Sequence, residues 1–179
     1  MKVINWFGGP HSGKSTQAAG LFHLMKSDGL SVELVNEYAK MKVWEGHIDI
    51  LQDQLYMLAK QNRRQMRLDG QVEYCVTDSP LILSAVYRNA YTNTLYTEQL
   101  DHITLECFQR FDNYNIYLER DPDYYERDGR AQDLDGALRI DEYMLELLNK
   151  WGIPYVSVPV GVATVPLMYK YIQKHYNDQ

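Results

Sequence analysis

The sequence contains little cysteine and no long apolar segment free of helix-breaking residues. Cys75 and Cys107 are the only two cysteines in 179 residues, which is too few for a disulfide framework and favours a reducing, cytoplasmic compartment. The first apolar run, residues 3–7, is interrupted by Asn5 and is too short for a signal peptide. The uncharged stretch 151–169 contains three prolines and two glycines, which argue against a membrane-spanning helix. We therefore expect a cytoplasmic protein without a membrane partner.

Basic residues are also scarce. The chain has 18 Lys and Arg against 24 Asp and Glu, a formal net charge of −6. Proteins that bind DNA or RNA through the phosphates need a surplus of basic residues, so this balance argues against a nucleic-acid partner. It does not exclude a small anionic ligand. The length, the 45% hydrophobic content and the absence of repeats or long linkers predict one domain over residues 1–179.

Short apolar strands alternate with helical segments, which predicts an α/β fold with a parallel sheet. The expected strands are residues 2–7, 31–36, 72–77, 114–118 and 155–158. The expected helices are residues 13–27, 38–44, 48–68, 81–90, 97–111, 134–150 and 164–176.

Residues 8–15 read GGPHSGKS and match the phosphate-binding pattern G-x-x-x-x-G-K-[ST]. Glycines let backbone N–H groups converge on one anion, and the following helix adds the positive end of its dipole. Lys14 is expected to reach the β- and γ-phosphates of ATP, and the Ser15 hydroxyl to ligate Mg²⁺. The expected ATP-binding residues are Gly8, Gly9, Pro10, His11, Ser12, Gly13, Lys14, Ser15 and Thr16.

Two acidic residues follow predicted strands, at the edge of the sheet where ligands bind in α/β folds. Asp78 is expected to hold Mg²⁺, with an N-cap role for the next helix as the alternative. Glu37 is expected to face the acceptor and take a proton from its hydroxyl group. The alternative for Glu37 is a solvated acid at a helix start.

The segment 119–130 is rich in arginine and acidic residues. Guanidinium groups can stabilise the charge of a phosphoryl group in transfer and exclude water. We expect residues 120–136 to form a lid, with Arg127 and Arg130 in catalytic roles. Ordinary surface ion pairs are the alternative.

Other side chains are candidates for binding the acceptor. Tyr38 and Trp44 follow Glu37 closely and could stack on a base. An acceptor that already carries phosphate would need cationic side chains, and the candidates are Lys40, Lys42, Arg63, Arg64, Arg67 and Arg88.

The motifs GGPHSGKST, NEYAK, VTDSP and ERDPDYYERDGR together resemble the phage and bacterial phosphate-loop family AAA-28. That family includes the kinase half of the bifunctional nicotinamide-mononucleotide adenylyltransferase/ribosylnicotinamide kinases. The resemblance implies a three-layer sandwich with a five-stranded sheet of order 2-3-1-4-5, and an ATP-dependent kinase. It also implies that Arg120 lies against adenine. Lys40 stands where relatives often carry arginine, so nicotinamide riboside is one acceptor among several.

We therefore predict an ATP- and Mg²⁺-dependent kinase of a nucleoside or nucleotide-like small molecule, with a nucleoside favoured. A nucleoside monophosphate kinase is the first alternative. A regulatory ATP hydrolase and a kinase of hydroxylated bases in DNA are further alternatives. The sequence leaves open which acceptor is used, which carboxylate is the base, and whether the protein forms a homodimer.

Overall fold

The computed structural model describes residues 1–90, 97–120 and 134–177. Its centre is a five-stranded parallel sheet in the order β2-β3-β1-β4-β5, as the family resemblance implied. The strands are β1 Lys2–Phe7, β2 Val32–Val35, β3 Tyr74–Thr77, β4 Asp112–Glu119 and β5 Val156–Pro159. Because β1 pairs with β3 on one side and β4 on the other, the loop that follows β1 leaves the middle of the sheet.

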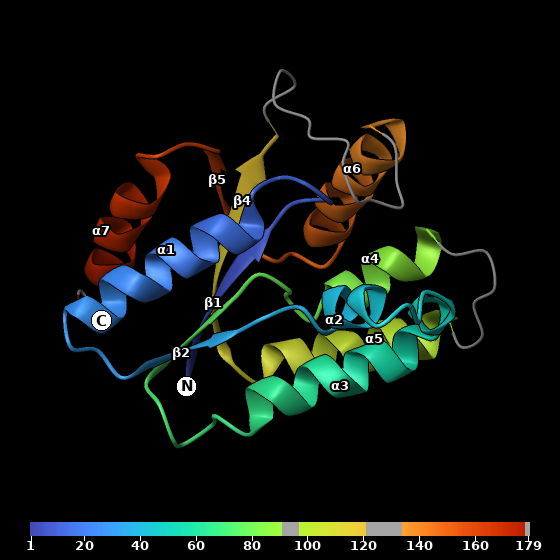
Figure 1. Ribbon diagram of the computed structural model, residues 1–179, viewed down its shortest axis with the longest axis horizontal. Helices are drawn as coiled ribbons and strands as arrows, with labels where there is room; N and C mark the ends of the chain where they lie inside the picture. Colours follow the sequence, from blue (N-terminus) through green and yellow to red (C-terminus); the bar gives the residue numbers. More distant parts are fainter. Residues whose placement is uncertain (91–96, 121–133, 178–179) are drawn as a thin grey trace.

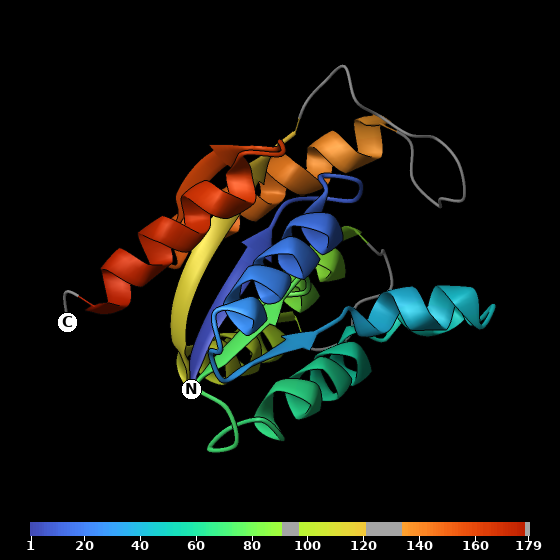
Figure 2. The same ribbon diagram turned by 60° about the vertical axis from the view of Figure 1, so that its left-hand side comes forward.

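Helices cover both faces of the sheet, which makes three layers (Figure 1). Helices α1 (Lys14–Ser27) and α7 (Thr164–Asn177) lie on one face. The opposite face carries α3 (Gln54–Met66), α4 (Leu83–Ala90), α5 (Thr97–Gln109) and α6 (Leu134–Lys150). The short helix α2 (Tyr38–Trp44), which contains no buried residue, projects beyond the end of β2 (Figure 2).

Each face of the sheet has its own apolar core. On one face, Leu21 and Met25 of α1 and Met168 of α7 pack on Ile4 and Trp6 of β1. On the other face, residues of α3 to α6, such as Leu58 and Met144, pack on Val3 and Phe7. Successive side chains of β1 point to opposite faces of the sheet, and helices bury them on both faces. This two-sided packing fixes the direction of β1 and therefore of the loop after it.

The prediction of one helix over residues 48–68 is wrong. A short 3-10 helix, η1 (Asp49–Gln52), ends before α3 begins at Gln54. Between them Asp53 is the N-cap of α3, and its side chain accepts a hydrogen bond from the Tyr56 N–H at 2.9 Å. Apolar residues at helical spacing continue across the break, so periodicity alone did not reveal the cap.

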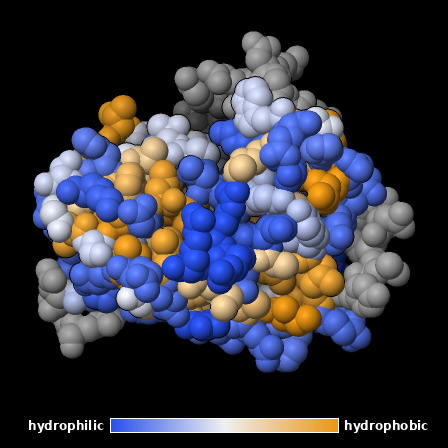
Figure 3. Space-filling model, turned by 60° about the horizontal axis from the view of Figure 1, so that its bottom comes forward, coloured by the Kyte–Doolittle hydropathy of each residue, from blue (hydrophilic) through white to orange (hydrophobic). Residues whose placement is uncertain are grey.

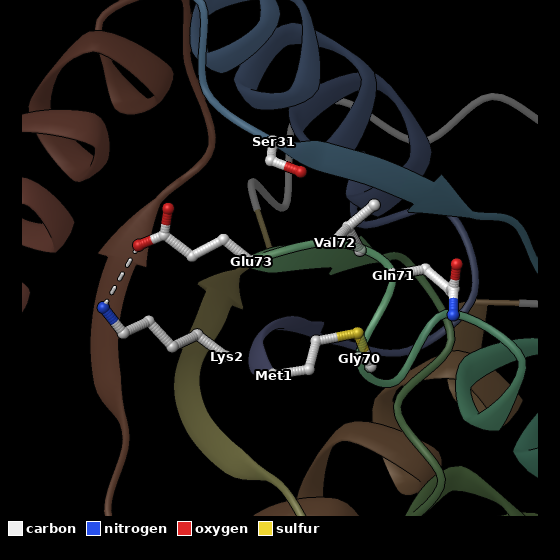
Figure 4. Close-up of a pocket in the computed structure, with 7 residues that line it drawn as sticks. All are labelled: Met1, Lys2, Ser31, Gly70, Gln71, Val72 and Glu73. Carbon is white, nitrogen blue, oxygen red and sulfur yellow. Dashed lines mark hydrogen bonds and ion pairs between the residues drawn. The ribbon is translucent and has the colours of Figure 1, made fainter.

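The edge at which the strands begin is polar and only shallowly hollowed. Figure 3 shows hydrophilic residues across the centre of this side of the molecule, with hydrophobic residues on both sides. A hollow of about 380 Å³ lies here (Figure 4), and the Lys2–Glu73 ion pair of 3.5 Å is at its border. The hollow is at the opposite edge of the sheet from the loop after β1, so it is separate from the site described below. None of the helices in the described part of the chain has the length and apolar character that a membrane crossing requires.

Candidate functional site

Residues 8–15, called the phosphate loop below, run from the end of β1 into the first turn of α1 at the carboxyl edge of the sheet (Figure 2). Gly13 is the N-cap of α1 and has a left-handed backbone with φ 83°, a conformation that favours glycine. The Ser12 hydroxyl donates to the Gly9 carbonyl oxygen at 3.0 Å, which closes the loop on itself. The N–H groups at the start of α1 therefore stand at the loop, where a phosphate would be bound.

Lys14 is folded over the loop. Its ammonium group donates to the Gly9 carbonyl oxygen at 2.7 Å. Burial lowers the pKa of Lys14, whereas the nearby carboxylates of Glu37, Asp78 and Asp141 act to raise it. Three acidic groups from different parts of the chain thus lie within electrostatic reach of one partly buried ammonium group, and they favour its charged form.

Asp78 lies directly after β3 and contacts the phosphate loop. The Ser15 hydroxyl donates to Asp78 Oδ2 at 2.6 Å, and Asp78 is only 3% exposed. Its other oxygen, Oδ1, is buried without a hydrogen-bond partner among the described residues. Helix α4 begins five residues later at Leu83, so Asp78 is not its N-cap. A buried carboxylate oxygen left over beside a serine hydroxyl fits a hard cation such as Mg²⁺.

Glu37 lies directly before α2, and its side chain does not cap that helix. Burial raises the pKa of Glu37, the Lys14 ammonium lowers it, and the Asp78 carboxylate raises it. Glu37 is therefore a partly buried acid within electrostatic reach of both other groups, and not a fully solvated acid at a helix start. The carboxyl ends of β1, β2 and β3 bring Lys14, Glu37 and Asp78 together, and the roles expected for these residues stay predictions.

Tyr38 and Trp44 are placed differently from each other. The Tyr38 hydroxyl is 2.8 Å from that of Tyr56, and the Arg64 guanidinium lies 5.0 Å from the Tyr38 ring centroid. Tyr38 thus joins α2 to α3. Trp44, at the end of α2, is 82% exposed, and the role of base stacking stays a prediction for both.

Arg88 is buried in the helical layer. It donates to Asp101 Oδ2 of α5 at 2.9 Å, and only 8% of Arg88 is exposed. The structure therefore pairs this cation with a neighbouring helix, and its predicted contact with an acceptor remains untested.

Arg120 lies at the end of β4 and contacts the phosphate loop. Its Nη2 donates to the Pro10 carbonyl oxygen at 2.7 Å and its Nε to Asp141 Oδ2 at 2.8 Å. The guanidinium is thus bonded to the loop backbone, whereas the family resemblance implied that it contacts adenine. Arg127 and Arg130, and with them most of the expected lid, lie outside the described residues.

Asp141 is a site residue that the sequence analysis did not find. Its Oδ1 accepts a hydrogen bond from the Gly9 N–H, across 132 positions of sequence. A signal was available, because Asp141 occupies a core-facing position of α6 between the buried residues Ile140 and Met144. A lone carboxylate on the apolar stripe of a helix requires a specific partner.

Comparisons with known proteins show the family of this chain and a solved structure with the same fold. A sequence model of the AAA domain family AAA_28 matches residues 3–164. Among solved structures, the chain is similar to "NadR protein in complex with NAD and AMP-PNP", with a TM-score of 0.66 and 15% sequence identity. The match covers 97% of this chain and 49% of that one, so this chain spans about half of that structure, and the likeness shows a shared fold. No curated protein sequence matches the chain.

Proposed function

The chain belongs to the AAA domain family AAA_28, and from that membership we propose that it is an ATP-dependent phosphotransferase. The acceptor that we favour is a nucleoside, within the class of nucleoside or nucleotide-like small molecules. The observation that carries this proposal is the convergence of Lys14, Asp78 and Glu37 at the carboxyl edge of the sheet. A binding module needs only the first two groups, whereas a partly buried third acid within electrostatic reach of them is typical of an enzyme that also removes a proton. AMP-PNP, named with the similar structure, also supports ATP as the donor.

Each group has a distinct role in this reaction. The phosphate loop binds the triphosphate, and the Lys14 ammonium contacts its β- and γ-phosphates. Ser15 and Asp78 would hold Mg²⁺, because the free Asp78 oxygen and the serine hydroxyl are adjacent. When bound there, Mg²⁺ would neutralise negative charge that develops on the phosphate oxygens.

Glu37 is the residue that we assign as general base. Asp78 is engaged with Ser15, which leaves Glu37 to accept the proton of the acceptor hydroxyl. A bond forms between the acceptor oxygen and the γ-phosphorus as the bond from that phosphorus to the β–γ bridging oxygen breaks. The products are ADP and the phosphorylated acceptor, and the proton leaves on Glu37.

A nucleoside monophosphate kinase is the second candidate, and the surroundings of Tyr38 favour it. The Lys42 ammonium lies 5.4 Å and the Arg64 guanidinium 5.0 Å from the ring centroid of Tyr38. Both cations lie beside Tyr38, the residue directly after Glu37, and could bind a phosphate that the acceptor already carries. Lys42 is also paired with Glu45, so part of its charge is already balanced.

An acceptor panel tests the proposal and separates the two candidates. The purified protein is incubated with ATP, Mg²⁺ and either nucleosides or nucleoside monophosphates, and the products are identified by mass spectrometry. We expect a nucleoside monophosphate from the first set, formed by the wild type and not by Lys14→Ala. Diphosphate products from the second set alone would favour the second candidate. Binding of ATP without product from either set would refute the kinase proposal.

A further inference from the structure

We propose that Asp141 is a positioning residue for the phosphate loop and acts as a pair with Arg120. Asp141 accepts the Gly9 N–H through one oxygen and the Arg120 Nε through the other. Arg120 in turn donates to the Pro10 carbonyl oxygen. The two side chains therefore hold two successive residues of the loop, and we call them the Arg120–Asp141 brace.

The brace is buried and closely fitted. The side chains of Arg120 and Asp141 are 7% and 10% exposed. A Cβ atom added at Gly9 would lie 2.6 Å from Asp141 Oδ1 and 3.0 Å from Arg120 Nη2, so the loop backbone comes as close as a glycine permits. Burying an ion pair requires good geometry and further hydrogen bonds. Here those further bonds go to the phosphate loop, so the pair is tied to the conformation of the loop.

The brace acts on the group that contacts phosphate. Gly9 is held by Asp141 at its N–H, while its carbonyl oxygen accepts the Lys14 ammonium at 2.7 Å. A rotation of the Gly9 peptides would therefore displace the ammonium group. Asp141 is thus expected to preorganise the phosphate loop for a polyphosphate without contacting the polyphosphate itself. This inference depends on the proposed function only in requiring that the loop binds a polyphosphate.

The direction in which Asp141→Asn changes anion binding distinguishes a positioning role from an effect of charge alone. Asp141→Asn removes a negative charge beside an anion-binding loop, and by charge alone it should tighten anion binding. The asparagine also presents its NH₂ group to Arg120 Nε or to the Gly9 N–H, so one of the two hydrogen bonds is lost. If the role is positioning, binding weakens instead.

The experiment measures binding of inorganic tripolyphosphate and of AMP-PNP, each with Mg²⁺, by calorimetry. Tripolyphosphate has neither base nor ribose, so it reports on the phosphate loop alone. We expect Asp141→Asn to raise the Kd of both ligands by the same factor, about tenfold or more. The matched control is Asp101→Asn, which breaks another ion pair of low exposure, with Arg88. It should lower the unfolding temperature and leave tripolyphosphate binding unchanged.

A second variant keeps the test valid if the single one folds poorly. The double variant Asp141→Asn/Arg120→Gln leaves no buried charge unpaired. It should unfold near the wild-type temperature and still bind tripolyphosphate weakly. Wild-type or tighter binding by the Asp141 variants, or an equal loss in Asp101→Asn, overturns the inference. If the Asp141 variants weaken tripolyphosphate binding as expected but the wild type phosphorylates no acceptor, the proposed function is refuted and the role of the Arg120–Asp141 brace still holds.

Discussion

At the scale of single residues, the site depends on Lys14 and Glu37, two ionisable groups whose burial opposes their charges, and on the carboxylate of Asp78 beside them. Burial lowers the pKa of Lys14 and raises that of Glu37, while the attraction between the two groups counteracts both effects. Asp78 adds negative charge beside Glu37. A carboxyl group in such surroundings holds a proton more strongly than one in water, which suits a base that acts near neutral pH.

The pKa of Glu37 predicts the acid side of the pH profile. The unprotonated carboxylate is the active form of a base, so turnover should fall as the pH drops through the pKa of Glu37. Because burial raises that pKa above its ordinary value of 4.5, the midpoint should lie above pH 4.5. Glu37→Gln should reduce kcat by about 10² to 10⁴ and abolish this limb. Steady-state kinetics across pH measure both effects, and an unchanged acid limb in Glu37→Gln would exclude Glu37 as the base.

Asp78 Oδ1, which has no hydrogen-bond partner in the described part of the chain, predicts a dependence on Mg²⁺. Asp78→Asn removes the charge but keeps an acceptor for the Ser15 hydroxyl. We expect the Mg²⁺ concentration for half-maximal turnover to rise by about tenfold or more. A Mg²⁺ titration of the rate measures this, with nucleotide binding in EDTA as the control that should change little. An equal loss with and without Mg²⁺ would mean that Asp78 serves the loop rather than the metal.

At the scale of elements, strand lengths follow from pairing partners that a local pattern does not contain. Strand β2 was predicted over residues 31–36, but it pairs with β3 only from Val32 to Val35. Strand β4 is longer than predicted, because Asp112 and Asn113 pair with the start of β1. By contrast, α2 and α6 have the predicted bounds. Helix hydrogen bonds are local, so the sequence around α2 and α6 contains the signals for their ends, whereas the ends of β2 and β4 depend on strands far away in the sequence.

The break between η1 and α3 gives a test at this scale. Asp53→Ala removes the side-chain cap on the Tyr56 N–H and should lower the free energy of unfolding by about 1 kcal/mol. Asp49→Ala is the matched control, because Asp49 is also exposed and lies four residues earlier in η1. Its effect should be within about 0.5 kcal/mol. Urea denaturation measures both, and equal effects would show that the cap contributes nothing.

At the scale of the whole molecule, the parallel sheet brings short motifs from distant sequence positions together at its carboxyl edge. Lys14 and Ser15 could be predicted because their motif is continuous, and Asp78 and Glu37 because each follows a recognisable strand. The position of Asp141 on the apolar stripe of α6 marks it as a carboxylate that needs a partner, but its partner Gly9 lies 132 residues away in the sequence. Only the packing of α6 against the end of the sheet brings the two together, and no local pattern encodes that contact.

Binding of nucleotide to the phosphate loop should stabilise the entire domain. A ligand at 100 times its Kd adds about 2.7 kcal/mol to the free energy of unfolding. For a domain of this size, that corresponds to an increase in Tm of about 5 to 10 °C. We expect this increase with ATP and Mg²⁺, and its near disappearance in Lys14→Ala. Lys26→Ala, at the other end of α1 and paired with Glu33 on the surface, should retain it.

The most direct test follows the γ-phosphate of labelled ATP in the presence of a small-molecule extract. If a phosphoryl group passes from the phosphate loop to an acceptor facing Glu37, the label appears in an organic phosphate. It should do so with the wild type and not with Glu37→Gln, although both bind ATP. Label found solely in inorganic phosphate, at a rate that the extract and the Glu37 substitution leave unchanged, would contradict phosphoryl transfer and indicate a hydrolase.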